Sequence, residues 1–253
     1  MAVRFEVEEN IVTVTIDRPE VRNAVDGETA GELYRAFQRF DDDATLSVAI
    51  LTGADGVFCA GADLKAISGG TGNRIRAEGE GPLGCTRMLL SKPVIAAVEG
   101  FAVAGGLELA LWCDMRVAAR DAVFGVYCRR WGVPLVDGGT IRLPRLIGQS
   151  RAMDMILTGR GVSGEEALQF GLANRLVEKG DTVDAAKALA RSLAVFPQLC
   201  LRSDRLSAYE QWGMAQDAAI ANEYARGSTV IRSGETRDGA TRFARGEGRH
   251  GAF

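Results

Sequence analysis

A single carboxylate stands in an otherwise apolar stretch of the chain. Glu108 follows a Gly105-Gly106 pair and lies in the first turn of an expected helix, within the segment GGLELALWCD. A carboxylate in such surroundings is costly to bury unless it is paired or used. Two interpretations are open: Glu108 complements the positive end of the helix dipole, or it carries acid/base chemistry in a cleft.

The glycine pair before Glu108 suits a turn between a buried strand and a helix. Two short apolar runs precede it, at 94–98 and 101–103. Glycine lets the backbone come close to another group, and a helix N-terminus presents unpaired N–H groups. Such a turn can hold a negative or polarised oxygen, or it can merely reverse the chain. A second glycine-rich strand-to-helix turn occurs in the segment GADGVFCAGADLKAI.

The composition argues against several other kinds of chemistry and partner. The only histidine is His250, interpreted as a solvated tail residue, so neither a histidine-dependent triad nor a histidine-rich metal site is expected. The five cysteines show no C-x-x-C spacing and favour a reduced, cytoplasmic setting. A net charge of −3 gives no electrostatic footprint for nucleic acid or an anionic membrane. No signal pattern is expected, and no apolar run approaches the ~20 residues of a membrane span.

The elements that position these residues follow from hydrophobic periodicity. Alternation over 3–16 predicts a β-hairpin, and the continuous apolar run at 47–52 predicts a fully buried strand. Asp26 can cap a helix with an apolar face. That face carries Leu33, Phe37 and Phe40.

The rest of the chain continues the mixture of strands and helices up to about residue 195. We expect a surface loop at 69–84, a short helix at 84–91, strands at 114–119 and 172–177, and helices from about 138, at 150–157 and at 163–170. From residue 181 on, the strand pattern stops and the spacing is helical. The shift indicates an α/β core over 1–195 and a helical region over 196–253.

An ordered set of motifs resembles the crotonase family, the enoyl-CoA hydratase/isomerase superfamily. The motifs are DRPEVRNAV, VFCAGADLKAI, AGGLELALWCD, GGTIRLPRLIG, ILTGRGVSGEEALQFGLANRLV and FARGEGRHG. Together they cover nearly the whole chain. The resemblance implies an α/β spiral of repeated ββα units with a C-terminal helical part that assembles as a homotrimer, often as a dimer of trimers.

The resemblance gives the two glycine-rich turns a joint role. It implies that the backbone N–H groups of Ala62 and Gly105 hold the thioester oxygen of an acyl-CoA. Two such donors would stabilise the negative charge of an enolate, each by ~3 kcal/mol in the transition state. The resemblance also implies CoA or substrate contacts. These are Ala60, Asp63, Lys65 and Gly106, although Lys65 can equally be a solvated helix residue.

The second catalytic position departs from the family pattern. Hydratases of the family have one glutamate at the position of Glu108 and another four residues after a phenylalanine, where this chain has Cys128. A thiol is a poor substitute, with a pKa of ~8.5 and no second oxygen to hold water. Cys128 beside Arg129 and Arg130 can be an activated nucleophile, but we favour a small residue that lines a pocket, with Arg130 nearby.

Asp137 can supply the missing carboxylate. Some crotonases have a catalytic aspartate in this loop, at a position shifted by about one residue. Asp137 also precedes GGTIRL and can simply cap that helix, and the two roles are compatible.

We expect an enoyl-CoA hydratase-like enzyme that acts on an acyl-CoA thioester and uses Glu108 and Asp137, with no metal or redox cofactor. The first alternative is a double-bond isomerase with one shuttling carboxylate, and the second is a specialised lyase or hydrolase that uses Asp137. A third alternative, of another class, is a non-catalytic acyl-CoA-binding scaffold.

Overall fold

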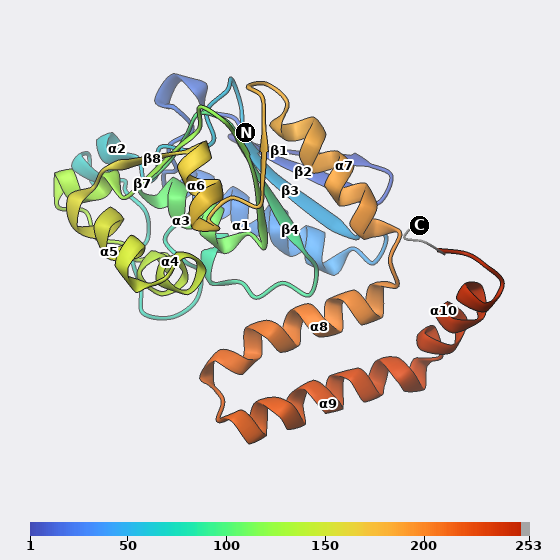
Figure 1. Ribbon diagram of the computed structural model, residues 1–253. Helices are drawn as coiled ribbons and strands as arrows, with labels where there is room; N and C mark the ends of the chain where they lie inside the picture. Colours follow the sequence, from blue (N-terminus) through green and yellow to red (C-terminus); the bar gives the residue numbers. More distant parts are fainter. Residues whose placement is uncertain (249–253) are drawn as a thin grey trace. The chain divides into compact units, whose positions relative to one another are not determined.

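The computed structural model describes residues 1–248 and is a mixed α/β structure (Figure 1). The chain forms two compact units, Met1–Arg191 and a second unit that begins at Ser192. The expected α/β fold class is confirmed. His250, expected to be a solvated tail residue, lies outside the described residues.

The first unit is built on a six-stranded sheet with the order β1-β2-β3-β4-β6-β9. Strand β1 runs antiparallel to β2, and the other neighbouring pairs are parallel. The strands are β1 (Val3–Glu8), β2 (Ile11–Ile16), β3 (Val48–Gly53), β4 (Val94–Val98), β6 (Met115–Ala119) and β9 (Arg175–Val177). Strands β3 and β4 are buried along nearly their whole length, which their continuous apolar sequences predict for a covered parallel sheet.

A second sheet has three strands in the order β5-β7-β8. These are β5 (Phe101–Val103), β7 (Val123–Gly125) and β8 (Gly161–Ser163). The two apolar runs at 94–98 and 101–103 therefore belong to different sheets, and the chain crosses between them at Glu99-Gly100. Strand β5 leads directly into the helix that carries Glu108.

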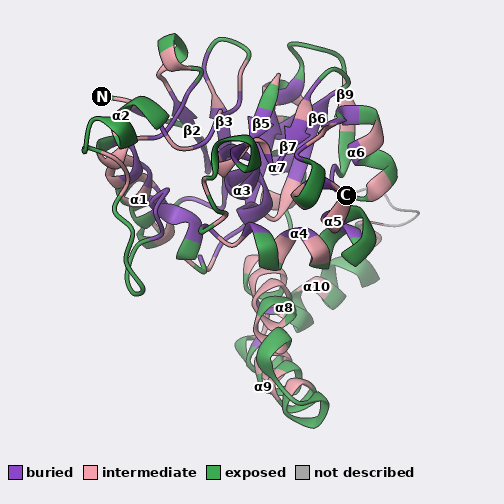
Figure 2. Cartoon of the chain, turned by 90° about the vertical axis from the view of Figure 1, so that its left-hand side faces the viewer, coloured by how far each residue is buried: buried purple, intermediate pink, exposed green. Residues whose placement is uncertain are grey.

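Seven helices accompany these sheets along the chain, and buried residues concentrate in the strands and in α3 (Figure 2). They are α1 (Gly27–Asp42), α2 (Leu64–Ser68), α3 (Gly105–Trp112), α4 (Gly139–Ile147), α5 (Gln149–Thr158), α6 (Gly164–Phe170) and α7 (Thr182–Ala194). The expected start of α1 is confirmed, because the Asp26 side chain accepts a hydrogen bond from the N–H of Thr29. The predicted apolar face of α1 is buried.

The helix expected over 84–91 is wrong. The chain forms only one 3-10 turn there, η2 (Cys85–Arg87), and then becomes extended at Met88. Other elements take up the backbone groups that a helix would use. Asp41 accepts a hydrogen bond from the N–H of Ser91, and the carbonyl of Met88 accepts one from the Trp112 indole. A second 3-10 segment, η3 (Tyr127–Trp131), carries Cys128.

The second unit is helical. Its α-helices are α8 (Gln198–Glu210), α9 (Gln216–Ser233) and α10 (Glu235–Ala244). The boundary predicted from composition, between 195 and 196, falls in the connection between α7 and α8. Across residues 1–248, every helix is too short or too polar to cross a membrane.

Candidate active site

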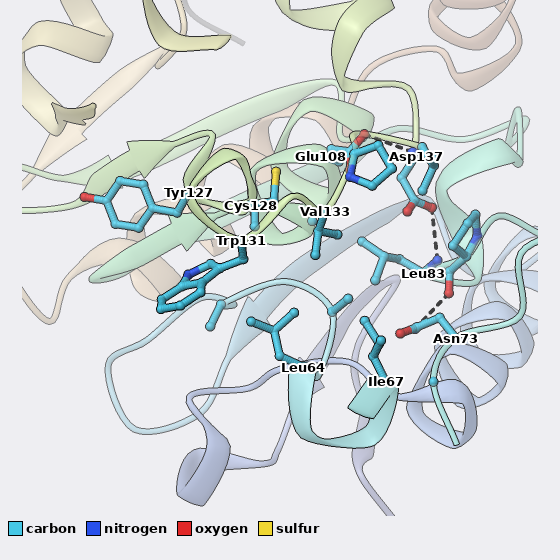
Figure 3. Close-up of a pocket in the computed structure, with 18 of the residues that line it drawn as sticks. Leu64, Ile67, Asn73, Leu83, Glu108, Tyr127, Cys128, Trp131, Val133 and Asp137 are labelled. Atoms are coloured by element: carbon cyan, nitrogen blue, oxygen red, sulfur yellow. Dashed lines mark hydrogen bonds between the residues drawn. The ribbon is translucent and has the colours of Figure 1, made fainter. Parts of the chain in front are cut away.

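A largely apolar cavity of about 600 Å³ opens beside the N-terminus of α3 (Figure 3). Its apolar lining includes Leu64, Ile67, Leu83, Trp131, Val133 and Val136. Two carboxylates, Glu108 and Asp137, also line it. A few polar groups in an apolar cavity are typical of a small-molecule site.

The two glycine-rich turns meet at this cavity. Cys59, at the start of the first turn, donates its N–H to the carbonyl of Phe101 at 2.8 Å, and its own carbonyl accepts the N–H of Val103 at 3.1 Å. These bonds hold the first turn alongside β5. Strand β5 in turn leads through Ala104 to Gly105, so two turns more than 40 residues apart become neighbours.

The N–H groups of Ala62 and Gly105 lie close together. A Cβ built on Gly105 would lie 3.4 Å from the nitrogen of Ala62, and one built on Gly61 would lie 2.7 Å from the nitrogen of Gly105. Over the described part of the chain, neither N–H has a protein acceptor. Ala104 precedes Gly105 with a φ of 55°, a conformation that is strained for alanine and typical of functional turns. Two unpaired donors at one cavity wall can bind one oxygen.

Glu108 is 2% exposed, and its carboxylate caps the N-terminus of α4. Its Oε1 accepts hydrogen bonds from the N–H groups of Asp137 at 2.9 Å and Gly139 at 2.8 Å, at the N-terminus of α4. Gly139 permits this approach, since a Cβ there would lie 2.9 Å from Oε1. Burial raises the pKa of Glu108 to about 7, despite these donors, and the nearby charge of Asp137 also raises it. A carboxyl group with such a pKa can serve as an acid or as a base near neutral pH.

Asp137 does not cap α4 with its side chain, as one interpretation of the sequence expected. The N-cap of α4 is Gly138, without a side-chain hydrogen bond. The Asp137 carboxylate points the other way, and its Oδ1 accepts hydrogen bonds from the N–H of Leu83 at 3.0 Å and from the Thr86 hydroxyl. Burial raises the pKa of Asp137, while the hydrogen bonds from Thr86 and Leu83 lower it.

Cys128 is buried and lines the cavity, but Arg130 is not among the lining residues. Burial raises the pKa of the Cys128 thiol, and the charge of Glu108 raises it further. The Arg130 guanidinium lies 3.9 Å from the centre of the Tyr127 ring and donates to the carbonyl of Gly159. The positive charges of Arg87 and Arg142 lower the pKa of Asp137.

Of the four residues expected to contact CoA or substrate, one lines the cavity and three do not. Ala60 lines the cavity, whereas Asp63, Lys65 and Gly106 do not. The Asp63 carboxylate caps α2 and pairs with Arg18 at 3.2 Å. Lys65 is exposed on α2. Gly106 packs against the first turn, because a Cβ there would lie 2.0 Å from the carbonyl oxygen of Cys59.

Sequence reasoning missed the groups that hold Asp137. Thr86 and Leu83 lie 51 and 54 residues before it, in a segment that carries no motif. Arg142 was also missed; it donates to the backbone carbonyls of Asp137 at 2.8 Å and Thr86 at 2.7 Å. The sequence signal for Arg142 is its position in the GGTIRL motif, five residues after Asp137.

Comparisons with known proteins give the family of the chain. Residues 6–250 match the family described as enoyl-CoA hydratase/isomerase. Carnitinyl-CoA dehydratase from Proteus mirabilis is 40% identical over 187 residues, which cover 73% of this chain and 71% of that protein. The crystal structure of an enoyl-CoA hydratase from Mycobacterium marinum superposes with a TM-score of 0.91 at 40% identity, covering 96% of each chain.

A second crystal structure, of an enoyl-CoA hydratase from Mycobacterium tuberculosis H37Rv, gives the same values: a TM-score of 0.91, 40% identity and 96% coverage of each chain. These neighbours confirm the crotonase-like fold that the motifs imply, including its C-terminal helical region. The chain belongs to the enoyl-CoA hydratase/isomerase family.

Proposed function

We propose that this enoyl-CoA hydratase-like enzyme adds water across the double bond of a 2-enoyl-CoA thioester, using Glu108 and Asp137 as its acid/base pair. The observation that carries the proposal is the meeting of four groups at one cavity. These are the two carboxylates and the unpaired N–H groups of Ala62 and Gly105. The reverse reaction, dehydration of a 3-hydroxyacyl thioester, uses the same groups.

The thioester oxygen is held by the N–H groups of Ala62 and Gly105. When water attacks C3, negative charge moves through C2 to this oxygen and forms an enolate. Donors already fixed in position stabilise that charge without reorganising, and each contributes about 3 kcal/mol to the transition state. Gly105 is also the first residue of α3, so the positive end of a helix dipole faces the same oxygen.

The two carboxyl groups divide the proton transfers. In each, one oxygen is anchored by hydrogen bonds: Oε1 of Glu108 by two N–H groups, and Oδ1 of Asp137 by Leu83 and Thr86. The other oxygen remains for substrate and water. Glu108, with a pKa of about 7, is available in its acid form to protonate C2. Asp137 takes the proton from the water whose oxygen bonds to C3.

An isomerase is the second candidate, and the Glu108 geometry supports it specifically. Moving a double bond needs one carboxyl group that removes and returns a proton, together with the oxyanion donors. A pKa of about 7 suits Glu108 for both directions. A specialised lyase or hydrolase that uses Asp137 would have the same cavity. A non-catalytic scaffold accounts less well for two carboxylates that line an apolar cavity.

Incubation with a short trans-2-enoyl-CoA in heavy water, followed by mass spectrometry of the thioester, tests the proposal. A gain of one water is the expected result. Deuterium at C2 or C4 without that gain would overturn hydration in favour of isomerase chemistry. An unchanged thioester across a series of chain lengths, with tight binding, would favour the scaffold.

The remaining expectations for this chain are consistent with the proposal. Hydration neither oxidises nor reduces the thioester, so the reaction calls for no redox cofactor, and CoA is part of the substrate. All five cysteines are free, in keeping with a cytoplasmic enzyme.

The family resemblance favours a homotrimer or a dimer of trimers. Helices α9 and α10 and the 3-10 turn between α8 and α9 expose large apolar side chains that such assembly would cover, namely Trp212, Ile220, Tyr224, Ile231 and Phe243. Light scattering coupled to size exclusion gives the number of subunits.

A further inference from the structure

The Asp137 carboxylate has a local alternative to its observed position. Aspartate directly before a helix commonly turns back and accepts hydrogen bonds from the helix N–H groups. In this chain the N–H groups of Asp137 and Gly139 are instead taken by Oε1 of Glu108. The α4 terminus is therefore capped from α3, and Asp137 is released from the local role that its sequence favours.

Something else must hold the released carboxylate at the cavity. Thr86 is 1% exposed and donates its hydroxyl proton to Oδ1 of Asp137. The N–H of Leu83 donates to the same oxygen at 3.0 Å. Leu83 offers a backbone group that any residue at 83 except proline would supply. The Thr86 hydroxyl is the only side-chain donor to this carboxylate among residues 1–248.

The surroundings of Thr86 fix it in place. Arg142 donates to the backbone carbonyls of both Thr86 and Asp137, so η2 and the start of α4 are tied together. Gly81 packs directly on the contact, because a Cβ there would lie 2.0 Å from Oγ1 of Thr86 and 3.0 Å from Oδ1 of Asp137. The threonine hydroxyl is thus held at one position relative to the carboxylate.

We propose that Thr86 is the positioning residue of the second acid/base group: its hydroxyl keeps the Asp137 carboxylate at the cavity and leaves Oδ2 as the oxygen that exchanges protons. The inference rests on the proposed function. With Oδ1 accepting two hydrogen bonds, a proton taken from water goes to Oδ2. Removing the hydroxyl leaves Oδ1 with the Leu83 N–H as its one donor and frees the carboxylate to rotate.

Three charged side chains face the Asp137 carboxylate. Glu108 faces it from α3, Arg87 from η2 and Arg142 from α4, and the neighbouring Cys85 stays a neutral thiol because burial raises its pKa. These groups remain when Thr86 is replaced. The Thr86 hydrogen bond lowers the pKa of Asp137, so its loss raises that pKa and moves the acidic limb of kcat/KM to higher pH.

The test compares Thr86→Val, Thr86→Ser and a matched control, Thr52→Val. Thr52 is also a buried threonine, 4% exposed, and its hydroxyl donates to the carbonyl of Ala97 away from the cavity. We expect Thr86→Val to lower kcat for hydration about 10- to 100-fold, with KM changed less than about threefold. Thr86→Ser and Thr52→Val should stay within about threefold of wild type. A Thr86→Val enzyme with the kinetics and pH profile of Thr52→Val overturns the proposal.

A readout independent of turnover separates this inference from the proposed function. Carbon-13 labelling of the aspartate carboxyl carbons, with the Asp137 signal assigned by its loss in Asp137→Asn, gives the titration of Asp137 directly. The expected result is an Asp137 titration at higher pH in Thr86→Val and at wild-type pH in Thr52→Val and Thr86→Ser. An unmoved titration in Thr86→Val overturns the inference, even if the enzyme hydrates enoyl thioesters. A moved titration supports it, even if the enzyme proves to be an isomerase.

Discussion

Oε1 of Glu108 accepts a hydrogen bond from the backbone N–H of Asp137 at 2.9 Å, so the first acidic residue caps the helix that begins beside the second. This hydrogen bond affects both the positions and the charges of the two residues. It places two carboxyl groups at one cavity wall, and it lets each charge raise the energy of the other in a partly dry site. A substitution at either residue is therefore expected to change the position and the pKa of the other.

Replacing Glu108 by glutamine removes a proton carrier and keeps the cap. The glutamine oxygen can still accept the N–H groups of Asp137 and Gly139, so the variant should fold. We expect kcat for hydration to fall about 10²- to 10⁴-fold, the range of general acid–base catalysis. Stopped assays at saturating thioester measure it. A variant within tenfold of wild type would show that Glu108 moves no proton in the rate-limiting step.

The same substitution should stabilise the protein at alkaline pH. The pKa of Glu108 is about 7 in the folded chain, against 4.5 for an unperturbed glutamate. Folding thus favours the protonated form; this contribution is fully present below pH 4.5 and is lost as the pH rises through about 7. The loss amounts to about 3 kcal/mol, and Glu108→Gln does not undergo it.

Urea unfolding of both proteins at pH 5 and pH 8 checks this difference. The free energy of unfolding of Glu108→Gln, relative to wild type, should increase between the two pH values. Glu108→Ala is a useful contrast, because it leaves the two α4 N–H groups without an acceptor and should lose about 1–3 kcal/mol relative to Glu108→Gln. An unchanged difference between wild type and Glu108→Gln at the two pH values would contradict a raised pKa.

Local sequence was sufficient for much of the fold. The cap at Asp26 and the apolar spacing of Leu33 and Phe37 predict α1, because capping and helical periodicity are properties of a few adjacent residues. Likewise, the apolar runs predict the central strands. The failed helix at 84–91 has the opposite origin: its backbone groups bond to Asp41 and Trp112, which lie far away in the sequence.

The features of the site likewise divide into those that local sequence predicts and those that depend on distant residues. Glu108 could be singled out because it contradicts its apolar neighbours, and the two glycine turns because glycine has a local signature. The orientation of Asp137 could not be predicted, because local chemistry favours a helix cap there. Its actual partners are 51 and 54 residues away. Only the folded chain brings Thr86 to Asp137.

Asp137→Asn should separate hydration from proton exchange. An amide cannot take the proton from water, so hydration should fall about 10²-fold or more. Exchange of a substrate C–H proton by Glu108 should persist. The charge of Asp137 raises the pKa of Glu108. In the variant, the pH dependence of proton exchange by Glu108 should therefore shift to lower pH. Deuterium incorporation measured across pH follows both effects. Equal losses of hydration and exchange would argue against separate roles for the two carboxyl groups.

Cys128 should be dispensable. Burial and the charge of Glu108 both raise the pKa of its thiol, so it stays protonated and is a weak nucleophile. We expect Cys128→Ala and Cys128→Ser to keep kcat within about threefold of wild type, with small changes in KM as the cavity changes shape. A loss above 100-fold in both variants, measured with the same thioester, would instead identify the thiol as a reacting group.

One added methyl group tests whether the N–H groups of Ala62 and Gly105 bind the thioester oxygen. Gly61 has a φ of 96°, and a Cβ there would lie 2.7 Å from the nitrogen of Gly105. Gly61→Ala therefore pushes the two turns apart where the thioester oxygen is expected to bind. The control is Gly56→Ala, at a φ of 71° with no atom within 4 Å of the added Cβ, which imposes similar backbone strain without that contact.

Displacing one such donor should lower kcat about 10²- to 10³-fold. We expect that loss in Gly61→Ala, with Gly56→Ala within about threefold of wild type. Thermal unfolding of both variants separates a misplaced donor from a misfolded chain. If both remain folded and both keep wild-type turnover, the thioester oxygen is not bound between Ala62 and Gly105, because no enolate stabilised there would tolerate a methyl group in contact with one of its donors.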